Sequence, residues 1–350
     1  MVTYLRGLVR YLLVACLCLS RSVATAFATP SSATISSHQK KLSSSSSVLH
    51  ASSSKANEGY VQVSRSDGSE HQLAYRIVRP MNLSSQQAAP IVALHGGPSV
   101  PSNYLYPLED VIPYRSIVFY DQLGCGKSDE PTDISQYSIE DSVQDLEVLL
   151  KKLGVRKFHL YGQSYGGILA FEYMKSVAES SSSDSQDEAK CLSAILSSAP
   201  SNVAQVEGEF VRLLDELKKT HSKDDGKEEL TEAQLQELFR TNHQCRITPE
   251  MPPKLKEAYA NAGTVWRGTD AIKEYVATAP EEEDAPRMPS SLILRGEYDF
   301  VSEECVASWK SVFNTQFLRY KTMKGCSYHG LFEDGAAYGE LIDSFCAEYD

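Results

Sequence analysis

The N-terminal part of this chain lacks acidic residues altogether. No aspartate or glutamate precedes Glu58, whereas the 57 residues before it contain six lysines and arginines. From Glu58 onward, 28 basic residues face 46 acidic ones, a net charge of −18. This acidic balance argues against the basic face that binding to nucleic acid requires. We therefore expect a small peptide or small-molecule substrate and no nucleic-acid partner.

Apolar runs long enough to span a bilayer are also missing, since about 20 residues are needed. The run at residues 11–19 is too short, follows Arg6 and Arg10, and precedes the small-x-small motif ATA at residues 24–26. This arrangement is typical of a cleaved signal peptide. We predict a signal peptide at residues 1–26 and no stable membrane association after processing.

The segment at residues 27–57 is rich in serine, contains three lysines and has the composition of a transit peptide. It begins with Phe27, directly after the predicted cleavage site. A signal peptide joined to a transit peptide in this way resembles the bipartite presequence of algae with secondary plastids. That resemblance implies delivery to the plastid (chloroplast). The alternative is a plain secretory signal followed by a serine-rich linker, which would place the protein outside the cell or in an endomembrane lumen.

Metal-binding cysteine patterns are absent as well, because no CxxC pair and no metal-type spacing with histidine occurs. Two of the eight cysteines, Cys16 and Cys18, lie in the predicted signal peptide. The other six stand singly at Cys125, Cys191, Cys245, Cys305, Cys326 and Cys346. We interpret them as small buried thiols. We predict neither a metal nor another cofactor.

From residue 58 onward, short β-rich runs alternate with helical patterns, which is typical of a mostly parallel sheet covered by helices. Two runs flank the turn Asp67-Gly68 and predict an opening hairpin. Five more have the length of buried strands, at residues 91–94, 117–120, 158–161, 194–198 and 292–295. Ser138, with Asp141 three residues later, predicts a helix start, and Gly154 predicts its end. The predicted class is α/β with a doubly wound sheet.

The alternation stops between residues 201 and 284, where helical stretches at 210–219 and 232–240 occur without a convincing strand. We therefore predict an α/β core at residues 58–200 and 285–350, interrupted by a helical cap at residues 201–284. The acidic run at 281–284 is interpreted as a solvated linker and not as a metal site.

The motif GQSYGG at residues 162–167 follows a predicted strand and opens a predicted helix. This context is that of a nucleophile elbow, in which small flanking residues let the strand and helix approach each other while the serine projects above the sheet. Ser164 is therefore the candidate nucleophile. A serine hydroxyl is weakly nucleophilic near neutral pH and needs a base, which in turn needs an orienting partner.

In this fold the chain order is serine, acid, histidine. Asp299 follows the predicted strand at 292–295 and is the expected acid, with Glu297 as the fallback. His329 lies on a loop after another strand, predicted at residues 317–323, and is the expected general base. Its assignment rests on chain order and placement. The rival histidines are expected to be structural, because His71 lies near the opening hairpin, His159 lies inside a strand, and His221 and His243 lie in the cap.

The motif HGGP at residues 95–98 follows a strand and can supply backbone N–H donors to an oxyanion. The expected pair is the N–H of Gly97, with Gly96 as the alternate, and the N–H of Tyr165. The alternative is that the two glycines only form a tight turn.

Three motifs together, HGGP at 95–98, FYDQLGCGKS at 119–128 and GQSYGG at 162–167, make the chain similar to a known family. From about Tyr60 to the C-terminus it resembles the proline iminopeptidase family of serine aminopeptidases, in particular its tricorn-interacting aminopeptidase branch. His243, Arg246, Pro252 and Pro253 look like that branch's cap. The resemblance implies an α/β-hydrolase fold, a serine triad without a metal, and release of an N-terminal residue, often proline, from short peptides. It also implies that Asp121 is structural.

Two departures from the family pattern concern Ser99, where the family usually has glycine, and the residue after the triad acid. Related enzymes bind the free amine through acidic residues in the cap and directly after that acid, but here Phe300 follows Asp299. The candidate substitutes lie in the cap at Glu207, Glu209 and Asp270. An aminopeptidase must stabilise a positive amine beside the bond it cleaves.

Three functional hypotheses follow from this sequence. The first is a serine aminopeptidase acting on short peptides whose N-terminal residue is proline or another uncharged residue. The second is a carboxylester or other small-molecule hydrolase with the same triad. The third is a ligand-binding receptor on a hydrolase scaffold. Dependence on a free amine separates the first from the second, and binding without turnover would indicate the third.

Overall fold

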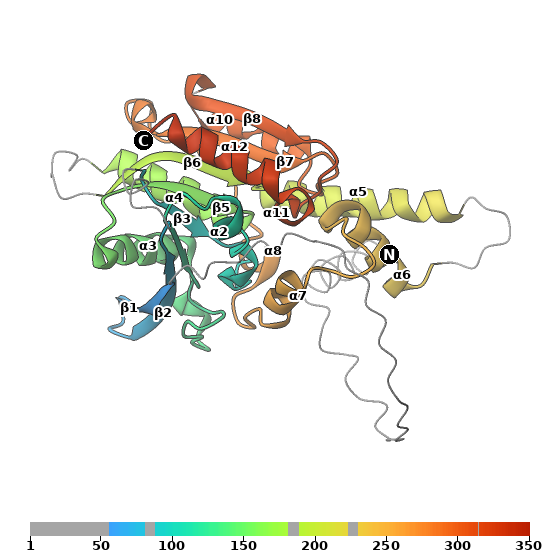
Figure 1. Cartoon of the computed structure of the whole chain (residues 1–350). Helices are drawn as coiled ribbons and strands as arrows, with labels where there is room; N and C mark the ends of the chain where they lie inside the picture. The colour runs from blue at the N-terminus through green and yellow to red at the C-terminus, as the bar shows by residue number, and fades with distance from the viewer. Residues whose placement is uncertain (1–55, 81–87, 181–188, 223–229, 314) are drawn as a thin grey trace, which may run out of the picture.

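The structure, a computed structural model, describes residues 56–80, 88–180, 189–222, 230–313 and 315–350. The predicted signal peptide and all but the last two residues of the transit-peptide segment lie outside these ranges. Eight strands form one sheet in the order β1-β2-β4-β3-β5-β6-β7-β8 (Figure 1). The strands are β1 (Asn57–Ser64), β2 (Glu70–Val78), β3 (Ile91–Leu94), β4 (Ile117–Tyr120), β5 (Lys157–Gln163), β6 (Lys190–Ser197), β7 (Ser290–Gly296) and β8 (Leu318–Met323).

The first two strands form the predicted antiparallel hairpin, β2 also pairs with β4 in antiparallel fashion, and the remaining pairs are parallel. The predicted α/β class is therefore confirmed. The α-helices are α2 (Leu108–Val111), α3 (Ile139–Leu153), α4 (Tyr165–Glu179), α5 (Val203–Ser222), α6 (Glu232–Phe239), α7 (Pro253–Ala260), α8 (Gly268–Ala271), α9 (Glu303–Ala307), α10 (Trp309–Val312), α11 (Gly330–Glu333) and α12 (Gly335–Ala347).

Both faces of the sheet are buried, because successive side chains of a strand point to opposite faces. In β3, Val92 and Leu94 pack into the core that contains side chains of α3 and α4. Ile91 and Ala93 pack into the second core, with side chains of α2 and α12. This explains why the central strands are continuously apolar and give no alternating pattern.

The helix α3 begins and ends where the sequence predicts. The Ser138 side chain accepts a hydrogen bond from the Asp141 N–H at 2.9 Å, and Gly154 follows the last turn with φ 66°. A side-chain acceptor satisfies one of the free N–H groups of the first turn, and glycine adopts the left-handed C-terminal conformation without steric cost. The position of α3 matters for the site because α3 packs on α4, the helix that follows Ser164.

Between β6 and β7, the chain forms α5, α6, a π-helix (η4, Arg240–Gln244), α7 and α8, which gather at one end of the sheet, on the right in Figure 1. Within the described part of residues 201–284, the only β pairing is an isolated bridge between Asn202 and Val276. We refer to this helical segment as the cap segment.

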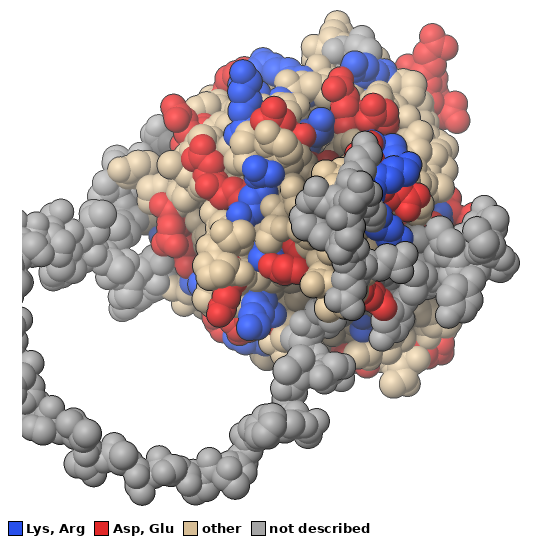
Figure 2. All heavy atoms as spheres, turned by 90° about the vertical axis from the view of Figure 1, so that its right-hand side faces the viewer, with Lys and Arg blue, Asp and Glu red and all other residues tan. Residues whose placement is uncertain are grey.

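The six cysteines in the described ranges are free thiols, and all but the half-buried Cys191 are buried, as predicted. None of the helices described in the structure has the length and apolar content needed to cross a membrane. On the face shown in Figure 2, acidic and basic side chains are interspersed and form no extended patch of one sign.

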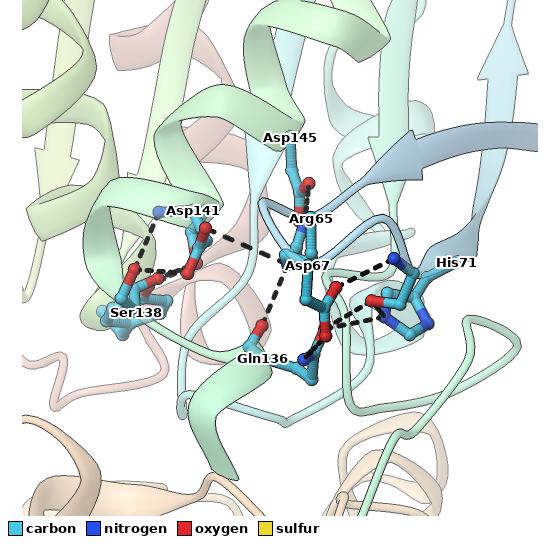
Figure 3. Close-up of polar contacts among 10 residues, drawn as sticks. Arg65, Asp67, His71, Gln136, Ser138, Asp141 and Asp145 are labelled. Atoms are coloured by element: carbon cyan, nitrogen blue, oxygen red, sulfur yellow. Dashed lines mark hydrogen bonds and ion pairs between the residues drawn. The ribbon is translucent and has the colours of Figure 1, made fainter. Parts of the chain in front are cut away.

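A buried ion pair connects the end of β1 to α3 (Figure 3). The Arg65 guanidinium donates to both carboxylate oxygens of Asp145 at 2.7 and 2.8 Å, and each side chain is 6% exposed. Its Nε also donates to the carbonyl oxygen of Gln136 at 3.0 Å. Such two-point contacts fix geometry as well as charge, so the pair holds the opening hairpin against the helix.

Candidate active site

Ser164 lies at the sharp turn between β5 and α4, with φ 57° and ψ −119°. A positive φ is uncommon for a residue other than glycine, and such strain concentrates at functional sites. The turn is possible because two neighbours lack a Cβ. A Cβ at Gly162 would lie 2.1 Å from the Gly166 carbonyl oxygen, and one at Gly166 would lie 2.1 Å from the Leu94 carbonyl oxygen. The motif therefore forms the strand, turn and helix that a nucleophile elbow requires.

Asp299 lies in the turn after β7 and is buried. Its carboxylate accepts hydrogen bonds from the Ser198 hydroxyl at 2.6 Å and from the Val301 N–H at 2.8 Å. Burial raises the pKa of Asp299 to about 7, against the opposing effect of these donors. Glu297, the fallback acid, instead accepts from the N–H of Gly325 near the surface. Of the two acids, Asp299 is thus the buried one.

His329 lines the same cavity as Ser164, but its ring is held by another partner. The Nε2 atom lies 2.6 Å from the hydroxyl oxygen of Tyr259. Burial lowers the pKa of His329 to about 3, so the ring is neutral near pH 7. Within the described residues, no hydrogen bond joins the His329 ring to Ser164 or to Asp299. The structure therefore brings the predicted base into the cavity without forming the two bonds that a triad requires.

Tyr328 lines the same cavity as Ser164. Burial raises the pKa of Tyr328. The Ser164 and Gln163 side chains lower this pKa, and the Asp299 charge raises it further. The ring stacks on Phe300 with a centroid distance of 4.5 Å. Tyr328 was not among the predicted site residues, and its only signal in the sequence is its position next to His329.

The two residues predicted to supply backbone donors to an oxyanion lie at the cavity beside Ser164. Gly97 and Tyr165 line it, and Tyr165 is the first residue of α4, where N–H groups are not used by the helix. In the described part of the chain, no acceptor pairs with the Gly97 N–H. The Gly96 N–H, by contrast, donates to the Tyr104 hydroxyl at 2.8 Å. Gly96 is therefore contradicted as the alternate donor.

The His95 side chain holds the loop that carries these glycines in place. The Nε2 atom of its buried ring accepts from the Gln122 N–H at 2.9 Å, and Nδ1 lies 2.9 Å from the Gly96 carbonyl oxygen. This pattern corresponds to a neutral ring protonated on Nδ1. Asp121 accepts from the Ser102 N–H and hydroxyl and from the Lys127 N–H. It therefore orders the neighbouring loops, as the family resemblance implies.

The cavity above Ser164 is small and apolar. Its volume is about 40 Å³, enough for about three water molecules at roughly 10–15 Å³ each. Its walls come from the elbow, the cap segment and the turn after Asp299, and none of the described residues that line it is charged. Val203, Val206 and Ile272 of the cap segment and Phe300 supply apolar surface. The site therefore fits one small uncharged group.

None of the three candidate amine-binding residues lines this cavity. Glu209 is bound by Arg212 at 2.6 and 2.7 Å and is therefore contradicted as a free ligand for an amine. Asp270 lies in α8, outside the cavity wall. Glu207 is separated from the cavity by one side chain, that of Thr269. The Thr269 hydroxyl donates to Glu207 at 3.3 Å, and Thr269 lines the cavity.

A serine on a strand–turn–helix elbow, with backbone donors on a neighbouring loop, defines an α/β hydrolase. The family model described as "alpha/beta hydrolase fold" matches residues 89–301. Two solved structures share the fold, VinJ (TM-score 0.62, 19% identity, 83% of this chain and 99% of that chain) and the proline iminopeptidase of Mycobacterium smegmatis (TM-score 0.61, 18% identity, 83% and 98%).

Curated relatives give the finer assignment. A proline iminopeptidase of Saccharolobus solfataricus is 32% identical over 285 residues, covering 73% of this chain and 84% of that protein. A proline iminopeptidase of Thermoplasma volcanium is 28% identical over 309 residues, covering 83% and 97%. The chain belongs to the proline iminopeptidase family.

Proposed function

We propose that the chain is a serine aminopeptidase that releases an N-terminal residue, proline or another uncharged residue, from short peptides. Its relatives carry the name proline iminopeptidase. The observation that carries the proposal is Ser164, which stands on a strained elbow at a small apolar cavity between two backbone donors. A small cavity beside the nucleophile favours a substrate with a single residue on that side of the cleaved bond, in line with an exopeptidase.

The reaction follows from this arrangement. The Ser164 oxygen attacks the carbonyl carbon of the N-terminal residue, and the oxyanion that forms is stabilised by the N–H groups of Gly97 and Tyr165, worth about 3 kcal/mol each. The C–N bond then breaks, and the leaving nitrogen takes up the proton that Ser164 lost to the predicted base, His329, which lines the same cavity. Water cleaves the resulting ester, which releases the free amino acid and returns a proton to Ser164.

The test is steady-state hydrolysis by the purified protein of the amides of proline, alanine and leucine, each with a free and with an acetylated amine, against a matched short acyl ester. We expect cleavage of the free-amine amides and loss of cleavage on acetylation. If the ester is turned over equally well with a free and with an acetylated amine and none of the amides is cleaved, the aminopeptidase assignment is wrong.

A carboxylester hydrolase is the second candidate, and one observation favours it. An amine at the scissile end carries a positive charge, yet none of the described residues that line the cavity is charged. An ester with an apolar acyl group would fit those walls without a counter-charge. The acetylated and free substrates of the previous experiment separate the two functions.

Glu207 is the carboxylate through which an amine would be recognised if the aminopeptidase proposal holds. Glu207→Gln keeps the size and the hydrogen bond with Thr269 but removes the charge. We expect KM for proline amide to rise about tenfold, the equivalent of about 1.4 kcal/mol, with KM for the neutral ester unchanged. Glu209→Gln is the matched control, because its carboxylate is already bound by Arg212. A rise of equal size in both variants would contradict a role for Glu207.

Within the family, we propose the tricorn-interacting branch. The cap segment supports it, because Arg246 lies over the Tyr298 ring at 4.0 Å and Pro252 and Pro253 begin α7, in line with the predicted cap pattern. Co-sedimentation with a tricorn-type protease tests this placement. Migration of the two proteins as separate species would count against it.

We also propose that residues 1–57 direct the protein to the plastid. The support is the acid-free composition of this leader and Phe27 after the predicted cleavage site. A fusion of residues 1–57 to a fluorescent protein is expected to accumulate in a secondary plastid, and Phe27→Ala to divert it. Secretion of the unchanged fusion would support the alternative of a plain signal peptide.

A further inference from the structure

Another cavity lies within the cap segment, and we call it the cap cavity. Its walls are formed by residues of α6, of the π-helix η4, of the loop at 249–251 and of α7. Its volume is about 320 Å³, whereas the cavity above Ser164 has a volume of about 40 Å³. Pockets for small organic molecules begin at about 300 Å³. The cap cavity is therefore large enough to hold a ligand of its own.

Arg240 holds the walls of the cap cavity in place. Its guanidinium donates to both carboxylate oxygens of Glu237 and to the carbonyl oxygens of Cys245, Ile247 and Pro249. These bonds use all five N–H groups of the side chain and join α6 to the loop before α7. The π-helix that begins at Arg240 is a rare conformation that occurs frequently at functional sites. The cavity is thus pre-formed, and the charges of Arg240 and Glu237 compensate each other.

Two side chains of opposite charge remain for a ligand. Lys256 and Glu250 line the cap cavity and are exposed. Within the described part of the chain, neither side chain has a hydrogen-bond or ion-pair partner. Ala233, Pro249 and Met251 add apolar surface to the walls. A carboxylate on Lys256, an ammonium on Glu250 and a small apolar body would satisfy this lining, whereas the two glutamates of the cavity disfavour a phosphate or another dianion.

The cap cavity and the catalytic cavity share one side chain, that of Tyr259. Its hydroxyl accepts a hydrogen bond from Nε2 of Gln244 at 3.1 Å and lies 2.6 Å from Nε2 of His329. Gln244 also lines the cap cavity. A ligand in the cap cavity is therefore separated from the predicted base by a single ring.

We propose that the cap cavity binds a zwitterionic amino acid or dipeptide, with the ligand carboxylate on Lys256 and the ligand ammonium on Glu250. This assignment comes from the lining of the cavity and does not depend on the proposed function. A ligand of this chemistry has two sources. It is either a free molecule or the leaving part of a peptide whose N-terminal residue is bound at Ser164, and in the second case its ammonium forms on cleavage.

The test is isothermal titration of the purified protein with leucine. We expect Kd to rise at least about tenfold in Lys256→Gln and in Glu250→Gln, because each variant removes one charge that the ligand meets. Leucinol lacks the carboxylate, and N-acetyl-leucine lacks the ammonium. Lys256→Gln should therefore not weaken the binding of leucinol, and Glu250→Gln should not weaken that of N-acetyl-leucine.

Lys254→Gln and Glu257→Gln are the matched controls, because both residues are exposed on α7 and neither lines the cap cavity. Thermal unfolding shows whether each variant is folded. Absence of leucine binding to the wild type would overturn the inference. Binding that Lys256→Gln and Lys254→Gln weaken equally, or that neither of them weakens, would also overturn it, because leucine would then bind elsewhere, for example at Ser164.

Kinetics separates the two sources of the ligand, and this comparison rests on the proposed function. If the ligand is the leaving part of a substrate, Lys256→Gln raises KM for prolyl-leucine about tenfold and leaves KM for proline amide, which has no carboxylate, unchanged. If the ligand is a free molecule, both KM values stay unchanged, and leucine alters turnover of proline amide in the wild type but not in Lys256→Gln. Leucine binding that depends on Lys256 in a protein that cleaves no amide supports the inference and removes the aminopeptidase assignment.

Discussion

Ser164→Ala is expected to lower kcat/KM for amide and ester substrates by several orders of magnitude, up to about 10⁶-fold. Removing the nucleophile of a serine hydrolase costs about as much as removing all of its catalytic side chains, because these residues act as a unit. The donors at Gly97 and Tyr165 stay in place and account for the residual rate. Steady-state kinetics with enzyme at high concentration measures the loss.

The loss should come from chemistry and not from the fold. Ser164→Ala keeps the strained backbone conformation, so the urea midpoint is expected to stay within the small range typical of conservative changes. Ser311→Ala is a suitable control, because the Ser311 hydroxyl is exposed and bonds only to the Ser308 carbonyl oxygen. Full activity in Ser164→Ala would mean that another group attacks the substrate.

Asp145→Leu is expected to destabilise the protein by about 3–5 kcal/mol, because the buried Arg65 guanidinium loses its closest carboxylate and keeps only the more distant Asp141, 4.0 Å from its Nε. Arg65→Met should lower the free energy of unfolding by a similar amount, because it leaves the Asp145 carboxylate buried without a positive charge beside it. The double variant should lose less than the sum of the two, since neither charge is then left unpaired. Urea unfolding followed by far-UV circular dichroism gives the three free energies of unfolding.

An exposed pair gives the comparison. Arg212 and Glu216 lie 2.5 Å apart in α5, and their side chains are 51% and 57% exposed. Water already solvates both charges, so Glu216→Leu should change the free energy of unfolding by less than about 1 kcal/mol. Additive losses in the Arg65 and Asp145 cycle would show that the two buried charges do not depend on each other, contrary to their 2.7 Å contact.

Features set by neighbours in the sequence were predictable. The elbow at Ser164 needs glycine on both sides and a strand before it, and all of these features lie within a few residues of one another in the sequence. The start of α3 at Ser138 is equally local, because the capping oxygen and the N–H it accepts from are three residues apart. The hairpin and the parallel strands were predicted from apolar runs, because these runs are shorter than typical helices.

The way in which the loop that carries His329 is held was not predictable, because its partners are distant in the chain. The loop has no regular period, and its position depends on carbonyl oxygens at positions 243 and 244, more than 80 residues earlier in the chain. Chain order predicts His329 as the base, and His329 lines the Ser164 cavity. Likewise, the use of the Gly96 N–H by Tyr104 depends on where the ring of a later helical turn is placed.

Which acidic residue of the cap segment comes near the cavity was not predictable from the sequence either. Which glutamate of α5 faces the cavity depends on how that helix is rotated against the sheet, and the acidic residues give no periodic signal for it. Glu209 and Arg212 are three residues apart, a spacing at which opposite charges on a helix pair with each other.

The backbone bonds from residues 328 and 329 to the π-helix of the cap segment also bear on the timing of the reaction. Because these bonds join the cap segment to a loop that lines the Ser164 cavity, a displacement of the π-helix would move that loop as well. If the cap segment moves to admit a substrate, the loop returns to its place only when the cap segment does. The rate of that return then sets an upper limit on turnover that faster chemistry at Ser164 cannot exceed.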